Sequence, residues 1–161
     1  MTYMTRVTYM TEPAEAQELI ARIARVHARQ QVNYTINRGV RALDYGTPDD
    51  YADCFTADAV YEGVVPDGSV QRSRGTAELR RFAAEFKWPP GVMRHWLGCS
   101  DVEIDGGGAK VTSLKGALGA SPDGPVMRMV GRNTDTLAAC PDGRWRFASR
   151  LSEIISRRAP R

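Results

Sequence analysis

Residues 42–63, ALDYGTPDDYADCFTADAVYEG, decide the fold, because a helix end, a turn, a second helix and a strand follow one another within them. Gly46 and Pro48 end the first helix, since glycine is favoured just beyond a helix and proline cannot continue one. A short helix is predicted over 49–55, and the alternating run over 59–65 predicts a strand that a Pro-Asp-Gly turn closes. The segment therefore predicts helices that pass directly into a sheet.

The residues before this segment form a long helical stretch. Thr11 is a candidate N-cap, and a proline follows in the first turn, where it is favoured. Whether one helix runs from 12 to 45 or two helices meet near residues 27–31 is open at this stage. Residues 1–10 lack a helical period and are expected to form a loose arm. Apolar residues recur at helical spacing in two stripes, one of Leu19, Ile23 and Val26 and one of Ile36, Val40 and Leu43.

A third helix and four strands are predicted after the segment. Gly75–Phe86 has an apolar stripe at helical spacing, and the following Lys-Trp-Pro-Pro-Gly sequence stops the helix. Tight glycine-containing turns between consecutive β-like runs predict an antiparallel meander. Helices first and a meander second is an α+β pattern, here one domain over 11–155 with a basic tail, 156–161, that is expected to fray. The four runs cover residues 92–104, 109–120, 126–138 and 144–155.

The composition is that of one globular domain. The chain has 161 residues, 42% of them hydrophobic and 25% charged, and its formal net charge is only +3. The basic residues are spread along the chain, so a nucleic-acid partner is not expected. The three cysteines are widely separated and no Cys/His cluster has metal-ligand spacing, so we expect reduced thiols, no metal and no cofactor. No stretch has the character of a signal peptide or the length of a membrane span, so we expect a cytoplasmic protein without a membrane partner.

Several stretches, taken in order, resemble the SnoaL-like branch of the nuclear-transport-factor-2-like superfamily. They are the helix end with residues 42–63, the strand MRHWLGCSDVEIDGGGAKV (93–111), and the closing pair GRNTDTL (131–137) and PDGRWRFASRL (141–151). The resemblance covers roughly residues 28–152. It implies a cone-shaped half-barrel, in which a strongly curved antiparallel sheet surrounds a deep apolar pocket that the N-terminal helices close. It also implies a homo-oligomer, a dimer or trimer formed through the outer face of the sheet.

The resemblance points to two residues, Asp44 and His95. In the scytalone dehydratase and hexachlorocyclohexane dehydrochlorinase branch, an aspartate at the end of the first helix pairs with a histidine on the strand after the third helix. Asp44 in ALDYG and His95 in RHWLG match these positions. The other scytalone dehydratase positions are not matched. Leu43 stands where that enzyme has a tyrosine, residues 112–120 contain no second histidine, and Gly63 replaces a further pocket tyrosine.

An aspartate bound to one ring nitrogen of a histidine makes the other nitrogen an available base at neutral pH. Such a pair suits removal of a C–H proton beside a carbonyl or a leaving group, followed by elimination. We therefore expect a cofactor-independent lyase of the dehydratase type, with a small cyclic, polyketide- or terpenoid-like substrate. Because the family also contains isomerases, cyclases and non-catalytic subunits, two alternatives stay open. One is a polyketide cyclase or isomerase with Asp44 as the main acid–base group, and the other is a non-catalytic ligand-binding or structural subunit.

The expected substrate-binding residues come from helices and strands. Asn37 shares a helix face with Asp44. It is expected either to bind a substrate carbonyl or orient Asp44, or to have a capping or solvent-facing role. The polar run RNTDT (132–136) and Arg150 could reach the pocket, but solvated strand positions are the commoner interpretation. Aromatic and apolar side chains are expected to line the pocket or the core, namely Tyr51, Phe55, Tyr61, Met127, Met129 and Phe147.

Overall fold

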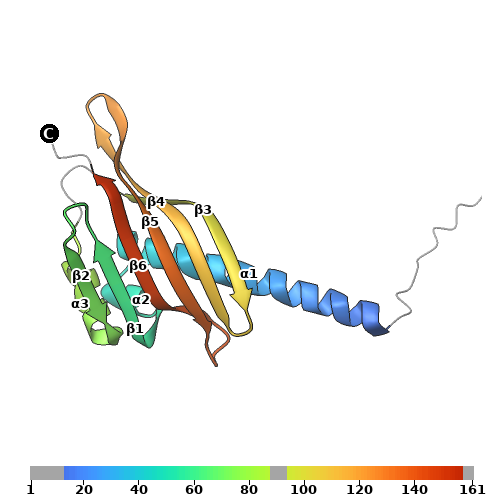
Figure 1. Cartoon of the computed structure of the whole chain (residues 1–161). Helices are drawn as coiled ribbons and strands as arrows, with labels where there is room; N and C mark the ends of the chain where they lie inside the picture. The colour runs from blue at the N-terminus through green and yellow to red at the C-terminus, as the bar shows by residue number, and fades with distance from the viewer. Residues whose placement is uncertain (1–12, 88–93, 158–161) are drawn as a thin grey trace, which may run out of the picture.

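The computed structural model describes residues 13–87 and 94–157, and within them the chain is α+β (Figure 1), which confirms the predicted fold class. The expected N-terminal arm, Thr11 and residues 92–93 of the first predicted meander strand lie outside the described residues. The elements, in chain order, are α1 (Pro13–Tyr45), α2 (Pro48–Ala52), β1 (Phe55–Val64), β2 (Val70–Arg74), α3 (Gly75–Glu85), β3 (Arg94–Asp105), β4 (Gly108–Ser121), β5 (Gly124–Ala139) and β6 (Trp145–Arg157).

The strands form one sheet in the order β2-β1-β6-β5-β4-β3. Strands β3 to β6 pair antiparallel with their sequence neighbours, which confirms the meander. The sheet differs from the expected antiparallel one at β1, which pairs with β6 in parallel and with the unpredicted strand β2 in a hairpin. The parallel pair arises because the chain runs from β2 through α3 to the far edge, and the meander then brings it back to β1. Strand β6 continues to Arg157, so residues 156–157, predicted as tail, belong to the sheet.

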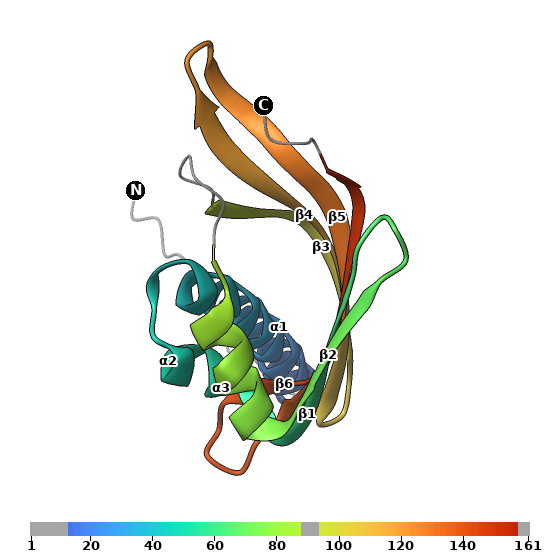
Figure 2. The same cartoon turned by 90° about the vertical axis from the view of Figure 1, so that its left-hand side faces the viewer.

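The sheet is strongly curved, and the helices lie against its concave face, here called the inner face (Figure 2). Along β4 and β5, buried residues alternate with more exposed ones. This alternation is expected when one face of a sheet packs on a core and the other meets solvent. The inward positions are odd-numbered, from Ala109 to Ala117 on β4 and from Met129 to Leu137 on β5.

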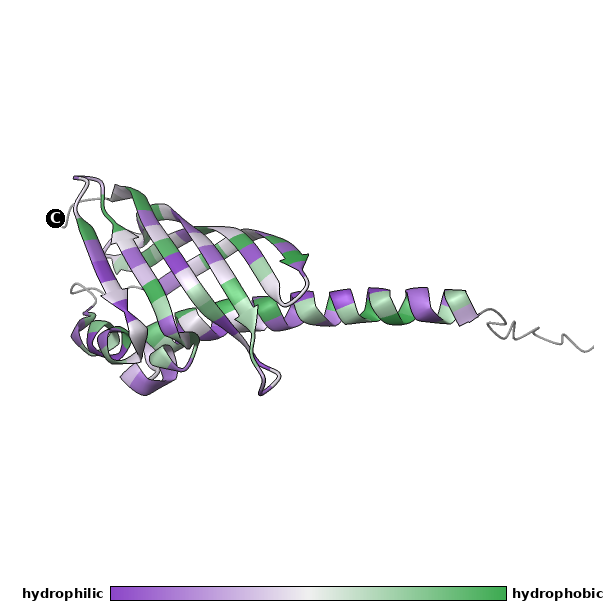
Figure 3. Cartoon of the chain, turned by 60° about the horizontal axis from the view of Figure 1, so that its bottom comes forward, coloured by the Kyte–Doolittle hydropathy of each residue, from purple (hydrophilic) through white to green (hydrophobic). Residues whose placement is uncertain are grey.

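Helix α1 is a single helix of 33 residues, which decides between one helix and two in this stretch. Only its second half packs on the sheet, since its buried residues all lie between Val32 and Ala42. At Gly39 a Cβ would stand 3.0 Å from the Phe147 ring, so glycine lets the helix approach β6 closely. The first half projects past the sheet (Figures 1 and 3) and exposes four apolar side chains, those of Leu19, Ile20, Ile23 and Val26.

Helix α2 is shorter than the helix predicted over 49–55. Thr47 begins it with a capping box, in which the Thr47 side chain accepts a hydrogen bond from the Asp50 backbone N–H at 3.1 Å. The Asp50 carboxylate in turn accepts from the Thr47 backbone N–H at 2.9 Å. The helix ends at Ala52 because Phe55 already pairs with Phe147 as the first residue of β1.

The core between the helices and the sheet is built on aromatic rings. Tyr51 from α2 packs on Phe55 and Phe82, with ring centroids 5.0 and 5.8 Å apart. Phe55 packs in turn on Phe147, at 5.0 Å. Tyr51, Phe55 and Phe147 are all buried within this cluster. Of the two surroundings left open for these residues, pocket or core, the structure shows the core for Tyr51 and Phe147. Phe55 belongs to the core and also lines a hollow at the surface.

Candidate active site

Asp44 and His95, here called the dyad, meet where α1 contacts β3. Asp44 lies in the last turn of α1, and His95 is the second residue of β3. Asp44 Oδ1 lies 2.8 Å from His95 Nδ1, and Asp44 Oδ2 accepts a hydrogen bond of 2.9 Å from the backbone N–H of His95. The structure thus brings together two residues that are 51 positions apart in the sequence.

The two side chains of the dyad differ in exposure. The Asp44 side chain is 2% exposed and the His95 side chain 15%. The ring of Phe86 stacks on the imidazole, with centroids 6.0 Å apart. Both oxygens of the covered carboxylate contact His95, so the imidazole is the more exposed part of the dyad. When Nδ1 donates to the carboxylate, the basic lone pair of the neutral imidazole is on Nε2.

Strand register places Met129, but not Met127, in line with His95. His95 is opposite Ala117 on β4, and Ala117 is opposite Met129 on β5, so the three share one row of the inner face. Met129 is 8% exposed, whereas Met127 is 44% exposed. A register shift after Ala117 pairs Met127 with exposed Leu118, because a β-bulge at this point turns the strand over. The expectation that Met127 lines a pocket or the core is therefore wrong.

The two other expected residues have different surroundings. The Tyr61 ring packs on Phe82, with centroids 4.5 Å apart, and its hydroxyl hydrogen bonds with Ser152. Burial raises the pKa of Tyr61, and the hydrogen bond with Ser152 opposes only part of this effect. Asn37 is exposed, and its Nδ2 donates to the backbone carbonyl of Asn33 at 2.9 Å. The Asn37 side chain is thus bound to its own helix, as the solvent-facing alternative predicts.

The inner face also carries a buried ion pair at positions that the sequence favours as solvated. Arg150 Nε and Nη2 each donate to one oxygen of Asp135 at 2.8 Å. The two side chains are 6% and 0% exposed. Burial alone would lower the pKa of Arg150, but the charge and hydrogen bonds of Asp135 outweigh it and raise this pKa. The signal that could have located the pair is the strand alternation in residues 132–136, which also turns Asn133 inward.

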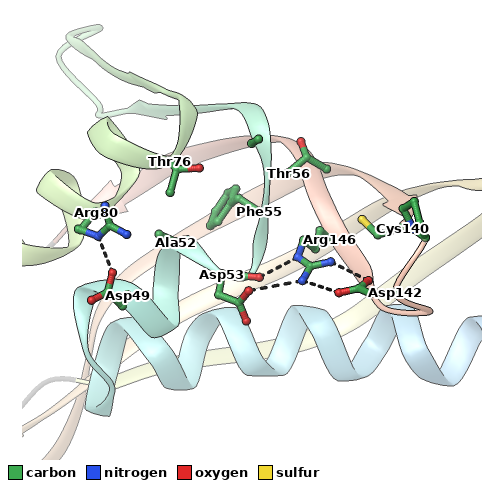
Figure 4. A pocket seen from close by; sticks show the side chains of 12 residues that line it. Asp49, Ala52, Asp53, Phe55, Thr56, Thr76, Arg80, Cys140, Asp142 and Arg146 are labelled. Carbon is green, nitrogen blue, oxygen red and sulfur yellow. Dashed lines mark hydrogen bonds and ion pairs between the residues drawn. The ribbon is translucent and has the colours of Figure 1, made fainter.

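A hollow of about 690 Å³ opens among α2, α3, β1 and the turn between β5 and β6 (Figure 4). Arg146 lies between Asp53 and Asp142 and pairs with both, at 3.4 and 2.8 Å. Burial alone would raise the pKa of Asp53, but hydrogen bonds from Arg38 and Arg144 lower it to about 2. The hollow contains no member of the dyad, and each of its charged side chains is already in an ion pair. We therefore assign it a structural role.

Other common kinds of site have little support. Among residues 13–87 and 94–157, no group of three or more His, Cys, Asp or Glu side chains could hold a metal ion. In the same part of the chain, no helix is both long enough and apolar enough to cross a membrane. Cys54 is a free cysteine whose pKa burial raises to about 11, which makes its thiolate a poor candidate nucleophile at neutral pH.

Comparisons with known proteins agree with the observed fold. A family model described as a SnoaL-like domain matches residues 24–151, a range that contains both members of the dyad. A search of curated proteins gives no match.

Similar solved structures come from several bacteria. A protein from Catenulispora acidiphila, solved in complex with S-DNPA, is 25% identical with a TM-score of 0.65, and the match covers 80% of this chain and 94% of that one. An NTF2-like protein with a cystatin-like fold from Novosphingobium aromaticivorans is 18% identical, with a TM-score of 0.73 over 94% and 95% of the two chains. ActVI-ORFA from Streptomyces coelicolor is 19% identical, with a TM-score of 0.65 over 80% and 98%. The last two matches show a shared fold.

Proposed function

This chain belongs to the SnoaL-like family, and from this premise we propose that it is a cofactor-independent lyase of the dehydratase type. The family to which it belongs includes cofactor-independent polyketide cyclases and dehydratases. The proposed substrate is a small cyclic molecule of the polyketide or terpenoid kind. His95 is the proposed base, and Asp44 is the residue that positions it.

In the proposed reaction, His95 Nε2 removes a proton from a carbon beside a substrate carbonyl. The electrons of that C–H bond form a carbon–carbon double bond, while the C–O bond to a hydroxyl on the next carbon breaks. The leaving oxygen then takes the proton from the imidazolium, so the products are an unsaturated molecule and one water. Asp44 stabilises the imidazolium between the two proton transfers, because its carboxylate stays beside Nδ1.

The observation that carries the proposal is the two-point contact between Asp44 and His95. One oxygen holds the ring at 2.8 Å and the other holds the backbone of the same residue at 2.9 Å. The carboxylate is therefore fixed relative to both the strand and the imidazole, as a positioned base requires. Such a base contributes about 10²–10⁴ in rate. The contact also favours His95 over Asp44 as the proton acceptor, since both oxygens of Asp44 are occupied.

The surroundings of His95 support a substrate with an apolar ring. Phe86 stacks on the imidazole, and Met129 lies in the same row of the inner face. Flat apolar molecules are favoured next to aromatic and thioether side chains. The 25% identical protein from Catenulispora acidiphila, which was solved with S-DNPA, supports a small organic ligand for this fold.

A panel of cyclic β-hydroxy ketones tests the proposal. Each compound is incubated with the purified protein, and loss of water is followed by mass spectrometry. In deuterium oxide, incorporation of deuterium beside the carbonyl reports proton removal even when elimination is slow. We expect wild type to convert at least one compound, and His95→Gln and Asp44→Asn to lose this conversion. The matched control is His27→Gln, which changes an exposed histidine on the first half of α1 and should leave conversion unchanged.

Two results would favour a different function. If His95→Gln remains close to wild type while Asp44→Asn is inactive, Asp44 is the acid–base group and a cyclase or isomerase is the better description. If wild type binds compounds of the panel, converts none of them and binds them as well in both variants, a non-catalytic ligand-binding subunit is the better description.

A further inference from the structure

Lys115 is a buried lysine in the middle of the inner face. It lies on β4 opposite Leu97, two residues after His95 on β3, and it is 6% exposed. Its side chain passes over Gly131 of β5, where a Cβ would stand 2.6 Å from Lys115 Cε. Glycine at this position therefore leaves the space through which the lysine reaches from β4 toward β6.

The Lys115 ammonium has a hydroxyl as its partner. Its Nζ donates to Ser152 Oγ on β6, and among the described residues no carboxylate lies within ion-pair distance of it. The charged groups around it are already paired, since Asp135 is bound to Arg150 and Glu153 to an exposed arginine. Burial, together with the charge of Arg150, lowers the pKa of Lys115 to about 8, so the ammonium is charged at pH 7. A buried charge without a counter-ion is unfavourable, and an anionic ligand would provide one.

Two residues in the same strand row as Ser152 also carry unsatisfied polar atoms. Ser113 is opposite Asn133, and Asn133 is opposite Ser152, so these three residues form one row of the inner face. In the described part of the chain, Ser113 Oγ and Asn133 Oδ1 are buried and have no hydrogen-bond partner. Rotation of the Asn133 amide would present its NH₂ group at the same place. Unpaired buried polar groups are unfavourable, and a ligand that hydrogen bonds with both of them would remove this cost.

We propose that Lys115, Ser113, Asn133 and Ser152, here called the acid site, bind an acidic oxygen group of the substrate, either a carboxylate or a phenolic or enolic oxygen. This inference rests on the proposed dehydratase function and deepens it, because it specifies the molecule on which the dyad acts. His95 lies on β3, whereas the ammonium reaches β6, three strand spacings of about 4.8 Å away along the sheet. A substrate that contacts both groups is therefore an extended organic acid, such as one of two or more fused rings.

Binding of two naphthalene derivatives tests the acid site. Naphthalene carboxylate and naphthalene carboxamide have nearly the same shape, but only the first is an anion at pH 7. By isothermal titration calorimetry, we expect wild type to bind the carboxylate about tenfold more tightly than the amide, or better. Lys115→Met should lose this preference. Lys110→Met, which changes an exposed lysine of the same strand, should keep it.

A third probe, naphthol, separates the two sources of acidic oxygen. Binding of naphthol as its anion, detected from its absorbance and lost in Lys115→Met, assigns the site to phenolic and enolic oxygens. A preference for the carboxylate alone assigns it to carboxylates. If wild type prefers neither anion, or if folded Lys115→Met keeps the preference, the acid site is disproved. Thermal unfolding establishes that the variant is folded.

The pH dependence and a dyad variant complete the test. Affinity for the carboxylate should fall above pH 8, as Lys115 loses its proton, and Lys115→Arg should retain it at higher pH. Asp44→Asn should keep the carboxylate preference, because the dyad does not contact the acid site. The two proposals can therefore fail separately. If Lys115→Met loses the preference for the carboxylate but wild type turns over no compound, the acid site is supported and the dehydratase proposal is contradicted. If wild type turns over a compound but does not prefer the carboxylate to the amide, the dehydratase proposal is supported and the acid site is contradicted.

Discussion

Two carboxylate–base pairs lie on the same side of the curved sheet and differ in the chemistry of their bases. In the first, Asp135 and Arg150 share two hydrogen bonds of 2.8 Å and are almost completely buried. In the second, Asp44 is equally covered, but its partner His95 keeps part of its imidazole exposed. A guanidinium never gives up its proton in a protein, whereas an imidazole titrates near neutral pH. Both carboxylates make two contacts with their partner residue. The Asp135–Arg150 pair is nevertheless a structural pair, whereas the Asp44–His95 pair is a candidate for proton transfer.

The difference lies in what surrounds each base. Arg150 uses its donors on Asp135, and its guanidinium lies 4.0 Å over the Phe147 ring, so its contacts are all to the protein core. His95 uses one ring nitrogen on Asp44 and lies on β3, at the edge of the sheet. Burial of a charge pair is therefore poor evidence of function by itself. A partly exposed titratable partner is the more informative feature.

The largest effect is expected from Asp44→Asn. The amide has the size of the carboxylate, but its NH₂ group would donate to His95 Nδ1 and move the ring proton to Nε2. Turnover in the β-hydroxy ketone assay should fall by about 10²–10⁴, while the free energy of unfolding changes by about 1 kcal/mol. A variant that loses stability and activity together would show that the dyad resembles the structural pair.

Arg150→Met should lower the stability of the protein much more than Asp44→Asn does. It leaves the buried Asp135 carboxylate without a partner, so the free energy of unfolding should fall by about 3–5 kcal/mol in urea titration. The control is Arg132→Met, which breaks an ion pair with Glu153 whose arginine side chain is half exposed and should cost about 0–1 kcal/mol. Equal losses in the two variants would contradict a structural role for the buried pair.

Lys115 is a further charged residue on the same face, and within residues 13–87 and 94–157 it has no carboxylate partner. Its titration should make the free energy of unfolding depend on pH. Its pKa is about 8 in the folded protein and 10.5 when unfolded. Between these values the unfolded state binds more protons, so the free energy of unfolding should rise with pH. The expected rise is about 3 kcal/mol, and Lys115→Met should lack it. Urea titrations at several pH values measure both slopes. Identical slopes would show that Lys115 is not buried as a charge.

The smallest effect is expected from Asn37→Ala. Asn37 is exposed and bound to its own helix, so the change should alter the free energy of unfolding by less than about 0.5 kcal/mol and leave turnover unchanged. Urea titration and the same turnover assay measure the two quantities. A clear loss of turnover would show that Asn37 contributes to the reaction together with the dyad.

Much of the fold could be predicted because its signals are local. Glycine-containing turns mark the meander, and helical spacing together with Gly46 marks α1. The parallel pairing of β1 with β6 could not be predicted, since it depends on where α3 delivers the chain rather than on either strand. The exposed position of Met127 could not be predicted for a similar reason. Period-two alternation puts it on the same face as Met129, and only a bulge, which no residue type announces, separates them.

In the candidate site too, some residues could be predicted from the sequence and others could not. Asp44 and His95 could be identified because the family resemblance supplies positions that the chain matches one by one. Arg150 could not, because an isolated charged residue on a strand is usually solvated and its partner is 15 positions away. The burial of Lys115 could not be predicted for the same reason. Buried charges become visible only when the register of neighbouring strands is known.

The protonation of the His95 ring tests the proposed base without any substrate. The chain has two histidines, so nitrogen NMR of the imidazoles can assign His95 with His27→Gln as the reference. In the neutral ring we predict the proton on Nδ1, directed at Asp44, and the lone pair on Nε2; in Asp44→Asn the proton should move to Nε2. A neutral wild-type ring with its proton on Nε2 would contradict His95 as the base that Asp44 positions.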